Sequence, residues 1–365
     1  MRKPCPRFGG GFLCAFTNAG RDISNRHQGG FGLADYISRK AIYEQIEKAR
    51  DSKVVAYVTG DRPGLETQVS PEIVDLFVDH LDAIWPAKRI SLVLYTNGGD
   101  TAAAWRLINL IRTFCDELEV IVPAKALSAG TLICLGANKI IMTKQATLGP
   151  IDPSLNSPLG PIIPGSPNHR APVSVEAVQG FLDVATNELN IKNDAALAGI
   201  WTHLSQQIHP LVLGQIFRTR QQIRTLARKL LEFQKTDSEV IDRIVSFLCS
   251  ESGSHDHTIN RREARGLGLA IENPSQELYD ILKALQQDYV EFLSLREPFN
   301  PDTLLAGNPQ ANYAAPRALV ESSVFGSHQF LSVGSVVRVE VPNPMGAPQI
   351  GFQDMRSFEG WRKEA

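Results

Sequence analysis

The chain has 365 residues and a formal net charge of −2 at pH 7, and 43% of its residues are hydrophobic. The near balance of charge gives no general electrostatic basis for binding nucleic acid, and the hydrophobic content is that of an ordinary folded protein. Its five cysteines are scattered without any Cys-x-x-Cys pair, which argues against a disulfide framework or structural zinc and favours a reducing, cytoplasmic compartment.

Residues 1–34 are rich in glycine, arginine and asparagine, and we expect them to form a flexible N-terminal tail. The apolar stretch from Gly11 to Phe16 is too short and too interrupted for a signal peptide. No apolar run in the chain reaches the length of a membrane span, so we expect no transmembrane segment.

Strand and helix patterns alternate from residue 35 to residue 143. The helical patterns cover residues 35–52, 70–84, 101–114 and 128–136, and the strand patterns cover residues 54–59, 90–95, 118–122 and 140–143. Regular alternation of this kind predicts parallel strand pairing with right-handed crossovers.

The composition changes twice after residue 143. Residues 146–172 are rich in proline and glycine and predict a long ordered loop or flap. Helical patterns then cover residues 175–189, 211–233, 237–248, 261–266 and 275–292, and strand patterns cover 324–325 and 333–341. We therefore expect an α/β domain at 35–297, helical in its later part, and a small β-rich appendage at 298–365.

The junction at Ser128 carries the chemistry. A strand pattern ends at Val122, and a helix of small residues begins at Ser128. The preceding strand runs into Gly98-Gly99, whose backbone can turn its N–H groups toward a ligand. Neighbouring parallel strands end side by side, so Ser128 and the glycines are predicted to face one pocket, with the Gly99 and Ala129 amides as oxyanion donors.

Each part of this junction also has a plain structural explanation. Ser128 could be a helix N-cap that only satisfies backbone amides, and the glycine pair could be a tight strand-to-helix turn. A reaction site needs both parts together, which favours the functional interpretation.

The motifs around this junction resemble those of the Clp-fold serine peptidases. They are Leu94-Tyr95-Thr96-Asn97-Gly98-Gly99, Ala126-Leu127-Ser128-Ala129-Gly130-Thr131, Leu148-Gly149-Pro150-Ile151-Asp152-Pro153, Ser252-Gly253-Ser254-His255-Asp256-His257-Thr258-Ile259 and Glu263-Ala264-Arg265-Gly266-Leu267-Gly268-Leu269. The nearest branch is the serine dehydrogenase proteinase family, related to signal peptide peptidase A, within the Clp/crotonase superfamily.

This resemblance implies an α/β, Clp/crotonase-like superhelix of ββα units and a homo-oligomer. It also implies that Ser128 is the nucleophile, and that Gly98, Gly99 and Ala129 supply the oxyanion pocket. Asn97 stands where the wider fold often has a proline, which leaves the amide donors in place.

The general base does not follow from the motifs. Clp peptidases have a histidine where this chain has only Asp152 as an ionisable residue, and the lysine of the signal-peptide-peptidase relatives is also missing. His169 and Lys192 are the candidates for the base, each with a solvated side chain as the alternative. His255, a further candidate for the base, and His257 stand two residues apart and would point to one face of an extended segment. The pair could bind a metal or line a pocket, although two ligands alone make no zinc site, and the alternative is a polar turn before the helix at Arg261.

We therefore expect a serine peptidase or related hydrolase that cleaves an extended peptide or protein through an acyl-enzyme on Ser128. No cofactor or metal is expected, and no Gly-x-Gly-x-x-Gly motif after a strand supports redox chemistry. The alternatives are an inactive Clp-fold binding or scaffold protein and a crotonase-like enzyme that processes acyl-CoA.

Overall fold

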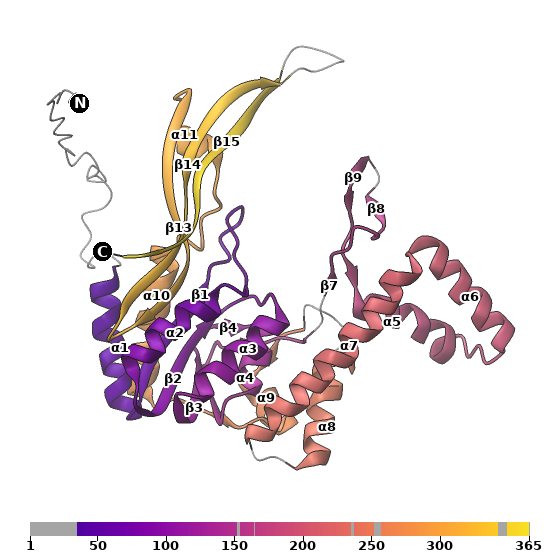
Figure 1. Cartoon of the computed structure of the whole chain (residues 1–365), viewed down its shortest axis with the longest axis horizontal. Helices are drawn as coiled ribbons and strands as arrows, with labels where there is room; N and C mark the ends of the chain where they lie inside the picture. The colour runs from indigo at the N-terminus through magenta and orange to yellow at the C-terminus, as the bar shows by residue number, and fades with distance from the viewer. Residues whose placement is uncertain are drawn as a thin grey trace, which may run out of the picture. The chain divides into compact units, whose positions relative to one another are not determined.

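The computed structural model describes residues 35–151, 154–163, 165–234, 237–251, 257–341 and 349–364. The predicted N-terminal tail therefore lies outside the described residues. The main feature of the described part is an eight-stranded sheet with the strand order β12-β5-β3-β2-β1-β13-β14-β15 (Figure 1).

The first five strands in this order are parallel. They are β12 (Ile271–Glu272), β5 (Lys139–Met142), β3 (Cys115–Val122), β2 (Ala87–Tyr95) and β1 (Lys53–Thr59). β1, β2, β3 and β5 are joined through intervening helices, so the predicted alternation of strand and helix is confirmed. Their apolar runs are buried because helices cover both faces of the sheet.

The two faces are distinguished by alternate residues of β2. Leu92 and Leu94 pack with α2 (Ile73–Ile84), α3 (Thr101–Arg112) and α4 (Ala129–Leu135). Val93 and Tyr95 point to the other face, which is covered by α1 (Tyr36–Arg50) and α10 (Gln276–Phe292). The two-residue period of a strand therefore divides the core into two layers.

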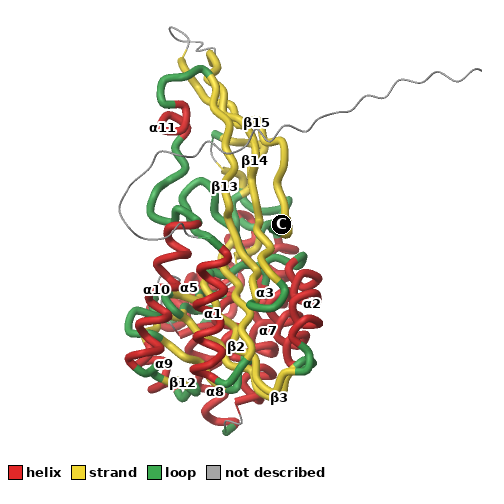
Figure 2. The backbone as a smooth tube through the Cα atoms, turned by 90° about the vertical axis from the view of Figure 1, so that its left-hand side faces the viewer, coloured by secondary structure: helices red, strands yellow, loops and turns green. Residues whose placement is uncertain are grey.

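The C-terminal strands are much longer than predicted. They are β13 (Gln310–Ser322), β14 (Gly326–Val341) and β15 (Gln349–Lys363), which lie side by side in antiparallel order after the short helix α11 (Pro301–Leu305) (Figure 2). The strand predicted at residues 324–325 is wrong, because these residues form the turn between β13 and β14. β13 pairs antiparallel with β1 and so continues the main sheet. The domain boundary predicted at residue 298 stays a prediction.

The segment after β5 holds short strands followed by helices. The strands are β4 (Lys125–Ala126), β6 (Thr147–Leu148), β7 (Ser154–Leu155), β8 (Ile162–Ile163), β9 (Ser166–Arg170), β10 (Val173–Ser174) and β11 (Ile259–Asn260), of which β4 precedes β5. The helices are α5 (Val175–Asp183), a π-helix (Val184–Glu188), α6 (Asp194–Gln207), α7 (Pro210–Leu231), α8 (Ser238–Ser246) and α9 (Arg261–Leu267).

Most of these helices match the predicted ranges, but α6 was not predicted. Leu204 is its one buried residue, so its sequence lacks the continuous apolar stripe that reveals a helix. None of the helices in the described residues combines the length and the apolar character that crossing a membrane requires.

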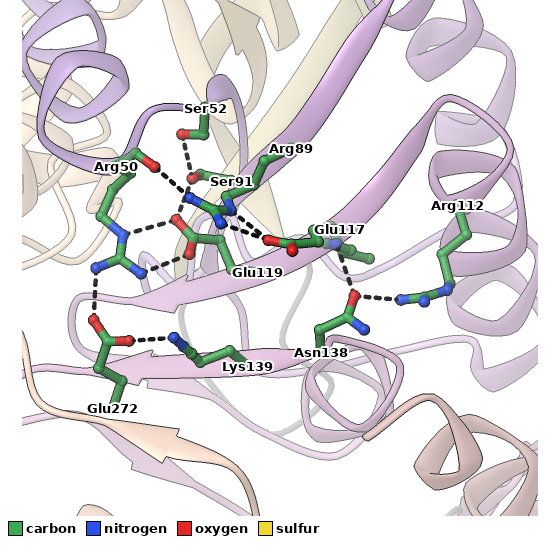
Figure 3. Close-up of polar contacts among 11 residues, drawn as sticks. Arg50, Ser52, Arg89, Ser91, Arg112, Glu117, Glu119, Asn138, Lys139 and Glu272 are labelled. Carbon is green, nitrogen blue, oxygen red and sulfur yellow. Dashed lines mark hydrogen bonds and ion pairs between the residues drawn. The ribbon is translucent and has the colours of Figure 1, made fainter. Parts of the chain in front are cut away.

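An ion-pair network runs across the parallel strands at the level of Lys139, the first residue of β5 (Figure 3). Arg50 joins Glu119 of β3 at 2.7 Å and Glu272 of β12 at 2.6 Å, and Lys139 of β5 reaches Glu272 at 2.7 Å. Ser91 of β2 donates to Glu119 at 2.5 Å. These contacts tie β2, β3, β5 and β12 together. They lie several residues before the carboxyl ends of β2 and β3, and Ser128 lies beyond those ends.

Candidate active site

The ends of β2 and β4 are hydrogen-bonded to each other. The Thr96 amide donates to the Lys125 carbonyl at 3.2 Å, and the Leu127 amide donates to the Thr96 carbonyl at 3.0 Å. These bonds hold the residues that follow each strand side by side. Gly98 and Ser128 therefore come together, as the parallel arrangement predicted.

The glycine pair is required by close backbone approach. Gly98 has a φ of +107°, and a Cβ atom there would lie 2.7 Å from the Ser128 Cβ and 2.7 Å from the Leu127 carbonyl oxygen. Gly99 has a φ of +141°, and a Cβ atom there would lie 2.4 Å from the Val69 carbonyl oxygen. Any other residue at either position would clash with backbone and adopt an unfavourable conformation.

Ser128 is held in a strained conformation at the start of α4. Its φ is 51° and its ψ is −113°, which is rare for a residue with a side chain. It occupies the N-cap position, yet its side chain makes no capping hydrogen bond. The simple capping explanation therefore fails, and the half-buried hydroxyl is available for another partner.

The backbone amides around Ser128 differ in their availability. The Gly98 N–H donates to Thr96 Oγ1 at 2.9 Å, so the oxyanion role predicted for Gly98 conflicts with a hydrogen bond already made. The Asp100 N–H donates to the Val69 carbonyl at 2.9 Å. Within the described part of the chain, the Gly99 and Ala129 amides have no acceptor. Two free donors next to a serine hydroxyl are the arrangement that a developing oxyanion requires.

Ser128 opens onto a cavity of about 850 Å³. Its walls include Asn97, Gly99 and Asp100 from the glycine turn, Glu66 to Glu72 from the segment before α2, Leu155 and Asn156, Thr219 of α7, and Arg317, Ala318, Phe330, Glu359 and Trp361 of the C-terminal strands. This volume is within the range of small-molecule and peptide side-chain sites.

None of the predicted bases lies on the wall of this cavity. His169 is in β9 and exposed, and Lys192 is exposed in the loop before α6. His257 is hydrogen-bonded through Nε2 to Glu263 at 2.9 Å and contacts the Phe247 ring. Asp152 and His255 lie outside the described residues. Of the predicted residues, the structure thus brings together Ser128, Gly98, Gly99 and Ala129.

The residues that sequence reasoning missed come from the C-terminal strands. Arg317, Phe330, Glu359 and Trp361 reach the cavity because β13 pairs with β1. No local motif marks them, and only the long-range pairing of strands brings them to Ser128.

The comparisons with known proteins agree with the predicted resemblance. Residues 73–188 match the family model described as ClpP-like SDH-type serine proteinase. An uncharacterized protein of Methanocaldococcus jannaschii is 31% identical over 202 residues, which cover 55% of this chain and 59% of the relative. A second uncharacterized protein of that organism is 24% identical over 259 residues, or 69% of this chain and 77% of the relative.

Among solved structures, a ClpP1 variant from Listeria monocytogenes is 15% identical with a TM-score of 0.34, covering 64% of this chain and 99% of that one. The chain spans about three fifths of the length of the first relative. The sheet, its covering helices and the family match together give a Clp-like α/β fold and confirm the resemblance to Clp-fold serine peptidases.

Proposed function

We propose that the protein is a serine peptidase with Ser128 as its nucleophile, since residues 73–188 match the family model described as ClpP-like SDH-type serine proteinase. The observation that carries this proposal is the uncapped Ser128 hydroxyl on a cavity wall beside two free amides. The strained backbone supports it, because strain of this kind gathers at functional sites.

In the proposed reaction, Ser128 Oγ attacks the carbonyl carbon of a peptide bond while a base takes the hydroxyl proton. The carbonyl oxygen becomes an oxyanion and accepts hydrogen bonds from the Gly99 and Ala129 amides. The C–N bond then breaks, the amine leaves with a proton, and water hydrolyses the ester on Ser128 to release the acid.

No histidine or lysine among the described cavity-lining residues is placed to accept the Ser128 proton. His169 and Lys192 stay as candidate bases, with Asp152, His255 and His257 as possible pocket residues. His169 and Lys192 are exposed and lie off the cavity wall. Either one would have to reach Ser128 through movement of its own segment or from a neighbouring copy of the chain.

Covalent labelling tests the nucleophile directly. The wild-type protein, Ser128→Ala and Ser205→Ala are treated with a fluorophosphonate, and the mass of each intact protein is measured by mass spectrometry. Ser205 is a partly exposed serine of α6, like Ser128 in its degree of burial, and serves as the matched control. One adduct on the wild type and on Ser205→Ala, with none on Ser128→Ala, is expected. Absence of labelling in folded wild-type protein would contradict an activated Ser128.

A second candidate is a Clp-fold binding protein that has lost catalysis. It is favoured by one observation, the lack of any histidine or lysine among the cavity-lining residues of the described chain. The labelling experiment separates the two, because a binding protein retains the fold and the cavity without a reactive serine.

We also propose that the chain forms a homo-oligomer in the cytoplasm. Nine of the fifteen large hydrophobic side chains found exposed in the described residues lie between residues 159 and 217. A monomer rarely leaves so many apolar side chains in contact with water on one segment. A second copy of the chain is the simplest partner, and sedimentation of the purified protein measures it.

A further inference from the structure

The C-terminal strands supply part of the wall of the Ser128 cavity. We call Arg317 of β13, Phe330 of β14, and Glu359 and Trp361 of β15 the arm wall. All four lie outside residues 73–188, the part of the chain that matches the family model. Any preference of the arm wall for a ligand therefore comes from the C-terminal strands and not from the part of the chain that matches the family model.

Two aromatic rings form the apolar part of the arm wall. The Phe330 and Trp361 ring centroids are 5.5 Å apart in an edge-to-face arrangement, with an interplanar angle of 73°. The Trp361 indole N–H donates to Glu72 Oε1 at 3.0 Å. This bond places a carboxylate at the edge of the indole ring, so an apolar surface and a negative charge lie together.

Arg317 is already committed to other partners. It donates to the Leu65 carbonyl at 2.9 Å, to Ser332 Oγ at 3.1 Å and to Glu359 Oε2 at 2.8 Å. Its side chain is 12% exposed. Arg317 and Glu359 therefore neutralise each other, and neither offers a net charge to a ligand.

The remaining charges of the cavity wall are negative. Its ionisable residues are Glu66, Glu72, Asp100, Glu359 and Arg317, four carboxylates against one guanidinium, for a net charge of −3. Asp100 accepts the Ala103 amide as a helix cap. Glu66 lies within the electrostatic reach of Arg317, which also donates to its backbone carbonyl. The Glu72 carboxylate accepts hydrogen bonds from Ser70 and Trp361, and among the described residues it has no basic side chain as an ion-pair partner. The cavity wall thus combines an excess of carboxylates, with Glu72 the one at the indole edge, and an aromatic surface.

We propose that this cavity selects a peptide with a lysine or arginine close to the bond that Ser128 attacks, an inference that rests on the proposed function. The aliphatic stem of such a side chain lies against the Trp361 and Phe330 rings, and its cationic group lies near Glu72 and Glu66. An aromatic face and a carboxylate both favour a cation over a neutral or acidic side chain. A long aliphatic stem also gains from apolar contact.

The test measures binding without catalysis. Two fluorescein-labelled decapeptides of alanine and glycine are compared, one with a central lysine and one with a central norleucine, which keeps the stem and removes the charge. Fluorescence anisotropy with Ser128→Ala protein gives both dissociation constants. The lysine peptide is expected to bind about five- to tenfold more tightly, and this ratio should fall as salt is raised.

Variants in the same Ser128→Ala background locate the effect. Glu72→Gln should make the dissociation constants of the lysine and norleucine peptides nearly equal. Trp361→Leu should weaken the binding of both peptides. Glu239→Gln, at an exposed carboxylate of α8 outside the cavity lining, should leave the ratio unchanged. Equal binding of the two peptides, or a ratio that Glu72→Gln does not alter, would overturn the proposal.

Failure of this inference and failure of the proposed function are distinguishable. Fluorophosphonate labelling of the wild type without a lysine preference leaves the peptidase in place and removes the selectivity. A lysine preference without labelling keeps the selectivity for a binding protein. Loss of both, including no measurable binding of either peptide, overturns the two together.

Discussion

The sheet and the helical segment at 154–217 bury their apolar side chains to different extents. Around the sheet, two large clusters enclose fully buried residues such as Phe77 and Leu107 on one face and Tyr43 and Leu282 on the other. The helical segment has one small cluster, made by Val173, Val175, Val178, Leu204, Val212, Leu213 and Ile216. Most of the exposed large hydrophobic side chains are found on this segment. The core around the sheet is therefore buried within one chain, whereas the helical segment leaves many of its apolar side chains exposed to solvent.

Helix α7 connects the two regions and explains how they can differ. Its first half contributes Leu213 and Ile216 to the small cluster, and its second half contributes Ala227 and Leu230 to the core of the sheet. Many buried side chains therefore pack around the sheet that positions Ser128, whereas few pack within the helical segment.

The largest expected effect concerns a buried ion pair that closes the sheet region. Arg39 of α1 is fully buried and binds Glu321 of β13 at 2.8 Å and Asp288 of α10 at 2.8 Å. Arg39→Met leaves the Glu321 carboxylate buried without a cation, and the free energy of unfolding should fall by about 3–5 kcal/mol. Urea unfolding measures this change, and Arg296→Met at an exposed position is the control. A loss below about 1 kcal/mol would contradict the assigned role of the pair.

The comparison between the regions is tested by one deletion in each core. Leu282→Ala in α10 should lower the global free energy of unfolding by about 2–5 kcal/mol, because it opens a cavity in a fully buried layer. Leu213→Ala in α7 should cost less globally and increase hydrogen exchange mainly in the helical segment. Equal global losses with exchange spread through the sheet would show that the two regions unfold as one.

The dependence of stability on pH has a specific source in the sheet region. His80 is buried between Ser322 and His328, and desolvation together with the nearby His328 and Lys363 lowers its pKa from 6.5 to about 3. Between these values the unfolded chain binds a proton that the folded chain does not, so stability falls as pH falls below 6.5.

From pH 6.5 to pH 5 this linkage amounts to about 1.6 kcal/mol of unfolding free energy. His80→Gln should remove most of that slope, whereas His203→Gln, at an exposed position of α6, should leave it unchanged. Urea titrations at a series of pH values measure it. An unchanged slope in His80→Gln would assign the acid sensitivity to other groups.

Local patterns predicted the position of the candidate nucleophile, Ser128, but not the cavity walls around it. The strand that ends at Tyr95, the glycines after it and the small-residue helix after Ser128 are all features of neighbouring residues, so the sequence reveals them. Trp361 is brought to Ser128 only by pairing between distant strands, a property of the whole fold. The candidate bases His169 and Lys192 were chosen by their position along the chain, and neither lies on the cavity wall. Position along the chain therefore did not identify a base near Ser128.

The smallest expected effect on stability concerns the exposed apolar side chains of the helical segment. Trp201 of α6 and Phe217 of α7 are 40% and 37% exposed, with ring centroids 6.1 Å apart. If a second copy covers this face, Trp201→Gln with Phe217→Gln should weaken self-association while changing the unfolding free energy of the monomer by less than about 0.5 kcal/mol.

Sedimentation velocity across a range of protein concentrations measures the association, with Ile350→Gln and Met355→Gln on β15 as the matched control. Those two side chains are 67% and 54% exposed, so the control removes comparable apolar surface from the sheet region. Dissociation by the first pair alone assigns the contact to the helical segment. Dissociation by the β15 pair alone would place it on the edge of the sheet, and the helical segment would then expose its apolar side chains for a substrate or another protein.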